Sequence, residues 1–190
     1  MATETLRPNV AGDATELVPS TAPNWECVNE AVANGDTDYV RNDAENTYER
    51  DLYNIPDTAI PAGSTINSVK VYWVARKVAV PSTRAIAGYS SIKTEGTIYE
   101  GSVQALTNSY VEYNTAYATN PNTGVAWTIA ELNALQIGTY LGNYYLDDTH
   151  FAYGRCTQVY VIIDYTPAAG LSIPVAMHHY SQTRRTRVAD

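Results

Sequence analysis

The segment 65–80 constrains the fold most, because its residues are typical of a single long β-strand. The segment is dense in β-branched and aromatic side chains. Val69, Val71, Trp73 and Ala75 recur at every second position, which places them on one face of a strand. Pro81 ends the segment. A strand of this kind predicts a sheet protein with a continuous buried face.

Other segments with strand character follow at short intervals, and turn residues separate them. Glu95-Gly96 predicts a tight hairpin turn. In 155–165, Cys156 and Gln158 are predicted on one face and Val159 and Val161 on the other, both largely apolar, so this strand is expected in mid-sheet. The predicted strands are 25–28, 39–40, 48–55, 65–80, 84–94, 97–100, 110–118, 137–143, 144–152 and 155–165.

One helix is predicted, over residues 127–136. Thr128 can cap it, and Glu131 stands three residues later in a capping-box arrangement. The sequence therefore predicts an all-β protein, an antiparallel β-sandwich of the jelly-roll kind with one short helix. An extended arm or first strand is expected over 1–23, the sandwich domain over 24–167, and an extended C-terminal arm over 168–190.

Tyrosine dominates the aromatic residues, with sixteen Tyr against one Phe. A tyrosine ring suits a pleated, half-exposed surface, because the ring packs while the hydroxyl reaches water or a partner. Trp25, Trp73 and Trp127 are expected in the core. Exposed tyrosines could stack on sugars or line a contact between subunits; the candidates are Tyr110, Tyr113, Tyr144 and Tyr145.

The net charge of −8 argues against nucleic acid as a partner of the domain. The charge is uneven: Ala168 to Asp190 carries three Arg and one Asp, a net of +2, which leaves −10 for the rest. No segment approaches the roughly 18 apolar residues of a membrane span. The N-terminus has neither a basic start nor an apolar run, so no signal peptide is expected.

The C-terminal segment is expected to dock on a partner or on its own domain, because it is too apolar to remain in water. Its alternating apolar residues are followed by a cluster of arginines that could clamp acidic groups. The predicted partner-binding arm comprises Leu171, Ile173, Val175, Met177, Tyr180, Arg184, Arg185 and Arg187.

No motif for catalysis or for phosphate binding is found, so the chain is not expected to be an enzyme. Asp36 and Asp38, in a turn with Gly35, place side-chain oxygens at alternate positions and could begin a calcium site, although an ordinary turn is the simpler interpretation. No other cofactor is expected. Cys27 and Cys156 are either small buried residues or a disulfide, if the fold brings them together.

Several motifs, taken as a set, resemble uncharacterised proteins of tailed bacteriophages and prophages. They include Thr5-Leu6-Arg7-Pro8-Asn9, Trp25-Glu26-Cys27-Val28-Asn29-Glu30, Arg50-Asp51-Leu52-Tyr53-Asn54-Ile55-Pro56, Thr119-Asn120-Pro121-Asn122-Thr123-Gly124 and Arg155-Cys156-Thr157-Gln158-Val159-Tyr160-Val161. The resemblance covers about residues 3 to 166. It implies a virion-associated, jelly-roll-like structural protein that is made in the host cytoplasm.

Three functional hypotheses follow. The first is a capsid decoration protein that binds the major capsid protein or another virion protein through its arms and Tyr-rich faces, as a homo-oligomer and preferably a trimer. The second is a tail or receptor-binding module that recognises glycans, with exposed aromatic residues near the 34–38 or 143–150 loops. The third is a filament subunit whose arm completes the sheet of the next copy.

Overall fold

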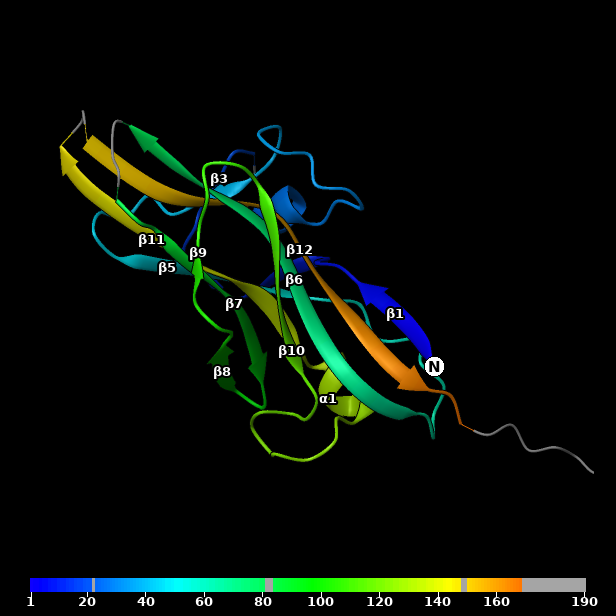
Figure 1. The fold of residues 1–190 in the computed structure, drawn as a ribbon. Helices are drawn as coiled ribbons and strands as arrows, with labels where there is room; N and C mark the ends of the chain where they lie inside the picture. The colour runs from blue at the N-terminus through cyan, green and yellow to red at the C-terminus, as the bar shows by residue number, and fades with distance from the viewer. Residues whose placement is uncertain (22, 81–83, 148–149, 169–190) are drawn as a thin grey trace, which may run out of the picture.

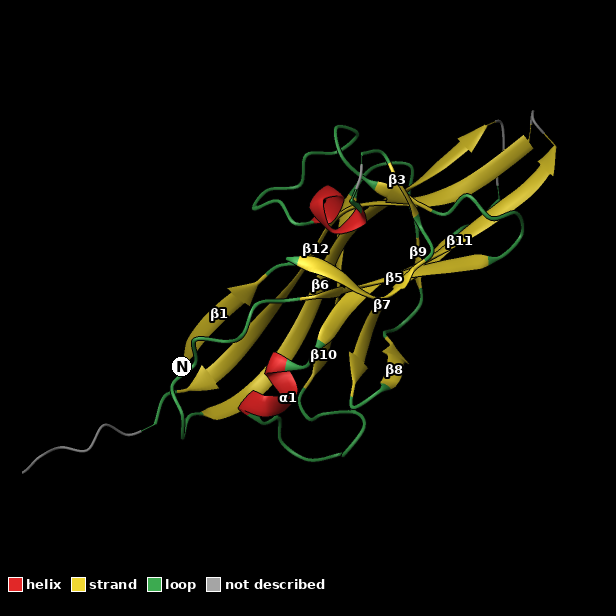
Figure 2. Ribbon diagram, turned by 180° about the vertical axis from the view of Figure 1, so that it is seen from behind, coloured by secondary structure: helices red, strands yellow, loops and turns green. Residues whose placement is uncertain are grey.

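The computed structural model describes residues 1–21, 23–80, 84–147 and 150–168, which form a curled, antiparallel β-sandwich (Figures 1 and 2). A 3₁₀ helix, η1 (Asn24–Val28), and a short helix, α1 (Ile129–Asn133), accompany the strands. Among the described residues, no helix has the length and apolar character needed to cross a membrane. The strands are β1 (Ala2–Leu6), β2 (Val10–Thr15), β3 (Val18–Pro19), β4 (Val40–Arg41), β5 (Tyr48–Asn54), β6 (Thr65–Val80), β7 (Ala87–Thr94), β8 (Thr97–Glu100), β9 (Gln104–Ala105), β10 (Val111–Tyr117), β11 (Gln136–Asp147) and β12 (His150–Thr166).

The two layers share one strand. In the first layer the order is β10-β6-β12, and β1 and β4 pair along the other side of β12. In the second layer the order is β2-β5-β11-β7, with β8 and β9 paired to β7. Residues 136–142 of β11 pair within the second layer, whereas residues 143–147 pair with β12 of the first. The ends of β6, β11 and β12 project together from one end of the molecule (Figure 1).

The predicted fold class and several predicted details are confirmed. β6 spans 65–80, and its residues Val69, Val71, Trp73 and Ala75 are all buried. Residues Glu95 and Gly96 both have positive φ, as a tight hairpin turn between β7 and β8 requires. The Thr128 side chain and Glu131 form the predicted capping box of α1. β12 pairs on both sides and therefore lies in mid-sheet.

Two predictions about elements are wrong. Segment 25–28 is the 3₁₀ helix η1 and not a strand, because the buried Asn24 side chain anchors it by donating to the Leu17 carbonyl and to Asp51. Segments 137–143 and 144–152 are not two strands around a turn, because β11 runs unbroken through Asn143 to Asp147. The segment 1–23, expected as an extended arm or first strand, forms β1, β2 and β3, which pair with β12, β5 and β4.

The hydrophobic core lies between the layers and fixes their separation. It contains the inward residues of β6, Val159, Val161 and Ile163 of β12, and Ile137 and Leu141 of β11, all almost completely buried. Trp73 and Trp127 are buried as predicted, whereas Trp25 is only partly buried against the core. Burial of this apolar surface supplies the main stabilisation of the fold.

A buried carboxylate holds the N-terminal strands to the second layer. Asp51 on β5 has no exposed surface. Its Oδ1 accepts hydrogen bonds from the backbone N–H groups of Glu16 (2.8 Å) and Leu17 (2.9 Å), and its Oδ2 accepts from Asn24 Nδ2 (2.7 Å) and the Tyr53 hydroxyl (2.9 Å). Burial raises the pKa of Asp51 more than these hydrogen bonds lower it. The carboxylate thus joins three segments that are distant in sequence.

The close approach of β11 to β5 depends on Gly138. A methyl group added there would overlap the backbone carbonyl of Asp51. We expect Gly138→Ala to lower the free energy of unfolding by about 2–3 kcal/mol, because the backbone cannot move aside without breaking the pairing. Urea denaturation measures this. The matched control is Gly142→Ala, four residues along β11, where the new group meets the Tyr48 ring and the Ala87 carbonyl near 3 Å. An equal loss in both variants would contradict the prediction.

Candidate functional site

A β-bulge in β12 determines which side chains of this strand lie on the outer face near the projecting ends of β6, β11 and β12. The register with β6 shifts between Cys156 and Gln158, so that Thr157 is the extra residue. Val159 lies opposite Trp73 on the core face, but Arg155 lies opposite Arg76 on the outer face. One inserted residue exchanges the two faces of a strand. The bulge therefore turns the odd-numbered residues of β12 before it, Phe151, Tyr153 and Arg155, to the outer face.

Because of this bulge, Cys156 and Gln158 do not share a face of β12 as the sequence predicted. Cys156 was expected beside Gln158, but it lies opposite Ala75 on the core face and is completely buried. The bulge residue itself has a role on the outer face. The Thr157 hydroxyl lies 2.9 Å from Asn34 Oδ1 and 2.8 Å from the Asp38 carbonyl oxygen, and this anchors the 34–38 loop on the strand.

A pocket of about 410 Å³ lies on this outer face, between the projecting β11–β12 hairpin, β4 and the loop that follows β4. The strand register places Asn143 beside Tyr153 and Tyr145 beside Phe151. The rings of Phe151 and Tyr153 are stacked, with centroids 6.0 Å apart. Phe151 is the single phenylalanine of the chain. The lining residues, hereafter the aromatic pocket, are Arg41, Asp43, Glu45, Asn143, Tyr145, Phe151 and Tyr153.

The polar side of the aromatic pocket is held in place by side chains of the loop after β4 and of β5. Asn42 donates to the backbone carbonyls of Leu141 (2.6 Å) and Thr47 (3.0 Å). Glu49 accepts from the backbone N–H of Asp43 (3.1 Å), and Asn46 Oδ1 accepts from the backbone N–H of Tyr145 (3.1 Å). A loop fixed by several such bonds is organised before a ligand arrives, which lowers the entropic cost of binding.

The charges in the aromatic pocket are of both signs. Arg41 forms an ion pair with Asp43 (3.3 Å), and its guanidinium lies 5.8 Å from the Tyr153 ring centroid. Glu45 is exposed and adds a second carboxylate, which gives the pocket a net negative charge. Arg41 Nε and Asn143 Oδ1 are buried and have no hydrogen-bond partner among the described residues. Buried polar atoms without a partner are uncommon in a folded protein.

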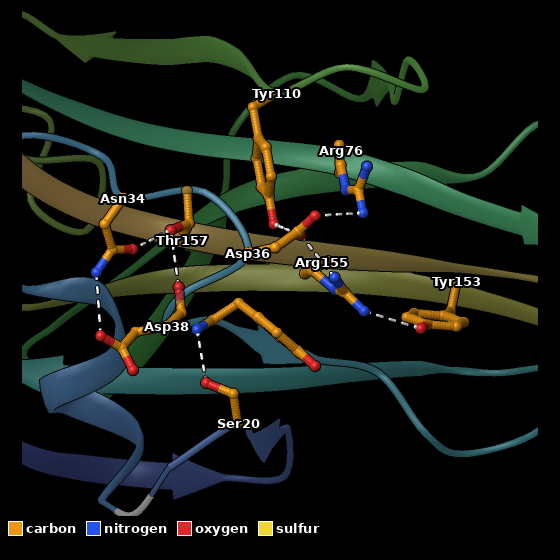
Figure 3. Close-up of polar contacts among 10 residues, drawn as sticks. Ser20, Asn34, Asp36, Asp38, Arg76, Tyr110, Tyr153, Arg155 and Thr157 are labelled. Carbon is orange, nitrogen blue, oxygen red and sulfur yellow. Dashed lines mark hydrogen bonds and ion pairs between the residues drawn. The ribbon is translucent and has the colours of Figure 1, made fainter.

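A network of arginines and tyrosines lies next to the aromatic pocket on the same face (Figure 3). Asp36 Oδ1 accepts from Arg155 Nη1 (2.6 Å) and from the Tyr110 hydroxyl (2.8 Å), and Asp36 Oδ2 accepts from Arg76 Nη2 (2.9 Å). The other end of the Arg155 guanidinium donates to the Tyr153 hydroxyl (3.1 Å). The Arg155 guanidinium also lies 3.7 Å from the centroid of the Tyr39 ring.

The sequence left open an ordinary turn or a calcium site at Asp36 and Asp38, and the contacts of both carboxylates favour the turn. Both oxygens of Asp36 already face guanidinium groups, and a further cation there would be repelled. The Asp38 carboxylate instead accepts hydrogen bonds from Asn34 Nδ2 (3.1 Å) and the Thr21 hydroxyl (3.1 Å). In the part of the chain that the structure describes, no three His, Cys, Asp or Glu side chains gather as metal ligands would.

The attachment of the loop at Asp36 is expected to depend on pH. Burial raises the pKa of the Asp36 carboxyl, but the hydrogen bonds from Tyr110 and Arg155 and the charges of Arg76 and Arg155 outweigh it, so its pKa lies below the ordinary 3.8. The interaction therefore stabilises the folded state above pH 3.8 and is lost as the pH falls through the lowered pKa. Amide chemical shifts of residues 30–38, followed from about pH 5 to about pH 2, should show this transition. The same transition in an Asp36→Asn variant would contradict the assignment.

Cys27 and Cys156 do not form the disulfide that the sequence left open. Both are free, buried thiols. Cys27 Sγ donates to the Thr21 carbonyl (2.8 Å) and Cys156 Sγ to the Gln158 carbonyl (3.3 Å). Burial raises the pKa of Cys156 to about 12, so its thiol stays protonated at neutral pH and is a poor nucleophile.

The four tyrosines predicted as exposed binding candidates lie at different places and do not form one site. Tyr145 lines the aromatic pocket, Tyr110 binds Asp36, Tyr113 packs on Trp73 with ring centroids 4.9 Å apart, and the Arg84 guanidinium covers Tyr144 at 4.4 Å. The predicted partner-binding arm lies outside the described residues; its members are Leu171, Ile173, Val175, Met177, Tyr180, Arg184, Arg185 and Arg187.

A second aromatic cluster lies on the outer face of the other layer. Tyr48, Tyr89 and Tyr140 come from the neighbouring strands β5, β7 and β11, with ring centroids 5.0 to 5.9 Å apart. Arg50 lies 4.2 Å from the Tyr140 centroid and forms an ion pair with Glu100. The sequence does not predict this cluster, because its members are about forty residues or more apart. This second cluster is hereafter the tyrosine triad.

Comparisons with known proteins concern the fold alone. No family model matches the sequence, and no curated protein matches it. Similar solved structures include a CBM4 structure, with 13% identity over 71% of this chain and 84% of that chain and a TM-score of 0.39. They also include a family 11 carbohydrate-binding module from Clostridium thermocellum in complex with a β-1,3-1,4-mixed-linked tetrasaccharide, with 11% identity over 88% of this chain and 91% of that chain and a TM-score of 0.37.

Proposed function

We propose that the protein is a non-catalytic recognition module that binds a carbohydrate in the aromatic pocket. The observation that carries the proposal is the composition of this pocket. The rings of Tyr145, Phe151 and Tyr153 share it with a guanidinium, a side-chain amide and two carboxylates. It also lies at the 143–150 hairpin, where the receptor-binding hypothesis predicts exposed aromatic residues.

Sugar chemistry matches this composition. A pyranose ring has an apolar face of C–H groups, which packs on an aromatic ring, and an edge of hydroxyl groups, which need directional hydrogen-bond partners. The Arg41 guanidinium and the Asn143 amide, which line the same pocket, supply hydrogen-bonding groups for such hydroxyls. Carboxylates are strong acceptors for hydroxyl groups. The Asp43 and Glu45 side chains can therefore accept from paired hydroxyls on the sugar edge.

The net negative charge of the aromatic pocket favours neutral sugars over acidic ones. Its two carboxylates outnumber its one guanidinium, and Arg41 is already paired with Asp43. An acidic sugar such as a uronic or sialic acid would be repelled at this site, because like charges at short range raise the free energy of the complex. The proposal is therefore for neutral glycans, which bring hydroxyl groups and no negative charge.

A glycan array and titration calorimetry test the proposal. The intact protein should bind one or more neutral glycans on the array and no uronic or sialic acids, and the binding should persist in EDTA, because the calcium site is not supported. Calorimetry on the best glycan then gives the Kd and the number of sites. Absence of binding to every glycan, or binding to acidic glycans only, would overturn the proposal.

A capsid-decoration role remains a separate proposal, favoured by the alternation of Leu171, Ile173, Val175 and Met177 in the C-terminal segment. Its partner would be the major capsid protein or another virion protein, and trimeric assembly and location in the virion belong to the same proposal. Deletion of residues 171–190 should abolish binding to capsids while leaving glycan binding intact. Unchanged capsid occupancy after the deletion would remove this idea, and concentration-dependent polymerisation of pure protein would favour a filament subunit.

A further inference from the structure

We propose that Asp36 is a positioning residue for the aromatic pocket, acting through Arg155 on Tyr153; the inference rests on the proposed function. Asp36 does not line the pocket, but a continuous chain of contacts joins it to Tyr153. Asp36 Oδ1 accepts from one terminal nitrogen of Arg155 (2.6 Å), and the other terminal nitrogen donates to the Tyr153 hydroxyl (3.1 Å) (Figure 3).

The guanidinium of Arg155 depends on Asp36 for its charge balance. Arg155 is only 9% exposed, and its Nε has no hydrogen-bond partner among the described residues. Asp36 is its only ion-pair partner in that part of the chain. A mostly buried cation that loses its counter-ion must reorient toward water or pay a large desolvation cost. Either change withdraws the donor from the Tyr153 hydroxyl.

The Tyr153 ring is therefore held on several sides. Arg155 fixes its hydroxyl, Phe151 stacks beside the ring, and the guanidinium of Arg41 lies 5.8 Å from its centroid. The hydroxyl accepts from Arg155 but keeps its own hydrogen, so Tyr153 offers a ligand its ring surface and one hydroxyl donor. A fixed ring binds a sugar face more tightly than a mobile one, since less side-chain entropy is lost on binding.

The loop 30–38 that carries Asp36 has further attachments, so loss of the Asp36 charge alone does not release it. Gln158 Nε2 donates to the Glu30 carbonyl (2.7 Å), and the Thr157 hydroxyl lies within hydrogen-bonding distance of Asn34 and of the Asp38 carbonyl. Asp36→Asn thus removes the charge of one side chain from an anchored loop. Coupling between two sites is reciprocal, so a ligand on Tyr153 should in turn protect this loop from hydrogen exchange.

The matched control for Asp36→Asn is Asp38→Asn, which removes the same charge from the same loop. The Asp38 carboxylate binds Asn34 and Thr21 and does not contact Arg155. With the best neutral glycan from the array, we expect Asp36→Asn to raise the Kd about five- to thirtyfold, and Asp38→Asn to change it less than about twofold. An equal effect of both variants would overturn the proposal, because it would show a general contribution of loop charge.

A double-mutant cycle with Tyr153→Phe tests the path of the coupling. This substitution keeps the ring but removes the hydroxyl that Arg155 holds. If Asp36 acts through that hydroxyl, Asp36→Asn has little further effect in the Tyr153→Phe background. Additive effects would contradict the proposed path.

A readout without ligand separates this inference from the proposed function. Aromatic ¹³C relaxation of Tyr153 should show faster ring motion in Asp36→Asn than in the wild type or in Asp38→Asn. Unchanged ring motion would overturn the positioning role even if glycans bind. Increased motion in a protein that binds no glycan would support the positioning role and reject the proposed function.

Discussion

Replacement of Asp51 by alanine is expected to lower the free energy of unfolding by about 3–4 kcal/mol, a large part of the stability of an ordinary domain. The reason is the number of donors that the carboxylate satisfies. Two backbone N–H groups, the Asn24 amide and the Tyr53 hydroxyl all point at it, and the site is closed to water. Alanine would leave these donors buried without partners, so the loss exceeds any gain from removing a buried charge.

Urea denaturation followed by tryptophan fluorescence measures this effect, and Asp57→Ala is the control. Asp57 is an exposed aspartate in the loop after β5, so its replacement should change stability by less than about 0.5 kcal/mol. We also expect β2 and β3 to lose their protection from hydrogen exchange in Asp51→Ala before the rest of the fold, because Asp51 joins them to β5. A stability loss no greater than that of the control would contradict this account of the N-terminal strands.

Replacement of Phe151 by alanine is expected to weaken glycan binding at least about tenfold, with a smaller effect on folding. The ring is part of the aromatic pocket and stacks beside Tyr153, but it lies on the projecting hairpin and outside the hydrophobic core. Loss of an aromatic surface that packs on a ligand removes both buried area and specific ring contacts, and about 1.4 kcal/mol corresponds to a factor of ten in Kd. Titration calorimetry with the best neutral glycan measures the change.

The matched control for Phe151 is Tyr140→Ala in the tyrosine triad. Tyr140 is also a partly exposed aromatic residue, but it lies on the outer face of the other layer. Its replacement should leave the Kd unchanged within about twofold, a difference well below 1.4 kcal/mol. If binding instead survives in Phe151→Ala and is lost in Tyr140→Ala, the glycan site lies on the tyrosine triad.

Local sequence signals predicted the elements whose determinants lie within a few residues. The alternation in 65–80 gives β6 and its buried face, Thr128 and Glu131 give the capping box, and Glu95-Gly96 gives the hairpin turn. The wrong predictions share a different cause. The conformation of 24–28 depends on Asp51, a partner that is distant in sequence, and the bulge at Thr157 depends on the register with β6. Such partners are not visible in a window of ten residues.

Some residues of the candidate site could likewise be named from the sequence, and others could not. The sequence named Tyr145 as a candidate exposed aromatic residue in a loop near 143–150, whereas the structure makes Asn143 to Asp147 part of β11. Arg41, Asp43 and Glu45 were missed, because they reach the aromatic pocket through the pairing of β4 with β12. The sequence left a calcium site open beside an ordinary turn at Asp36 and Asp38, because the cations that approach this turn are distant in the chain. The turn is real, but Arg76 and Arg155 come from β6 and β12 and occupy its carboxylate.

The continuity of β11 through both layers affects how the molecule would bear mechanical force. The aromatic pocket lies at one end of β11, and the other end is hydrogen-bonded to β5 and β7 deep in the second layer. Tension applied at the hairpin along the strand would load the hydrogen bonds on both sides of β11 in shear, many at once, and would not peel them apart singly. A module held by this end would therefore resist mechanical unfolding.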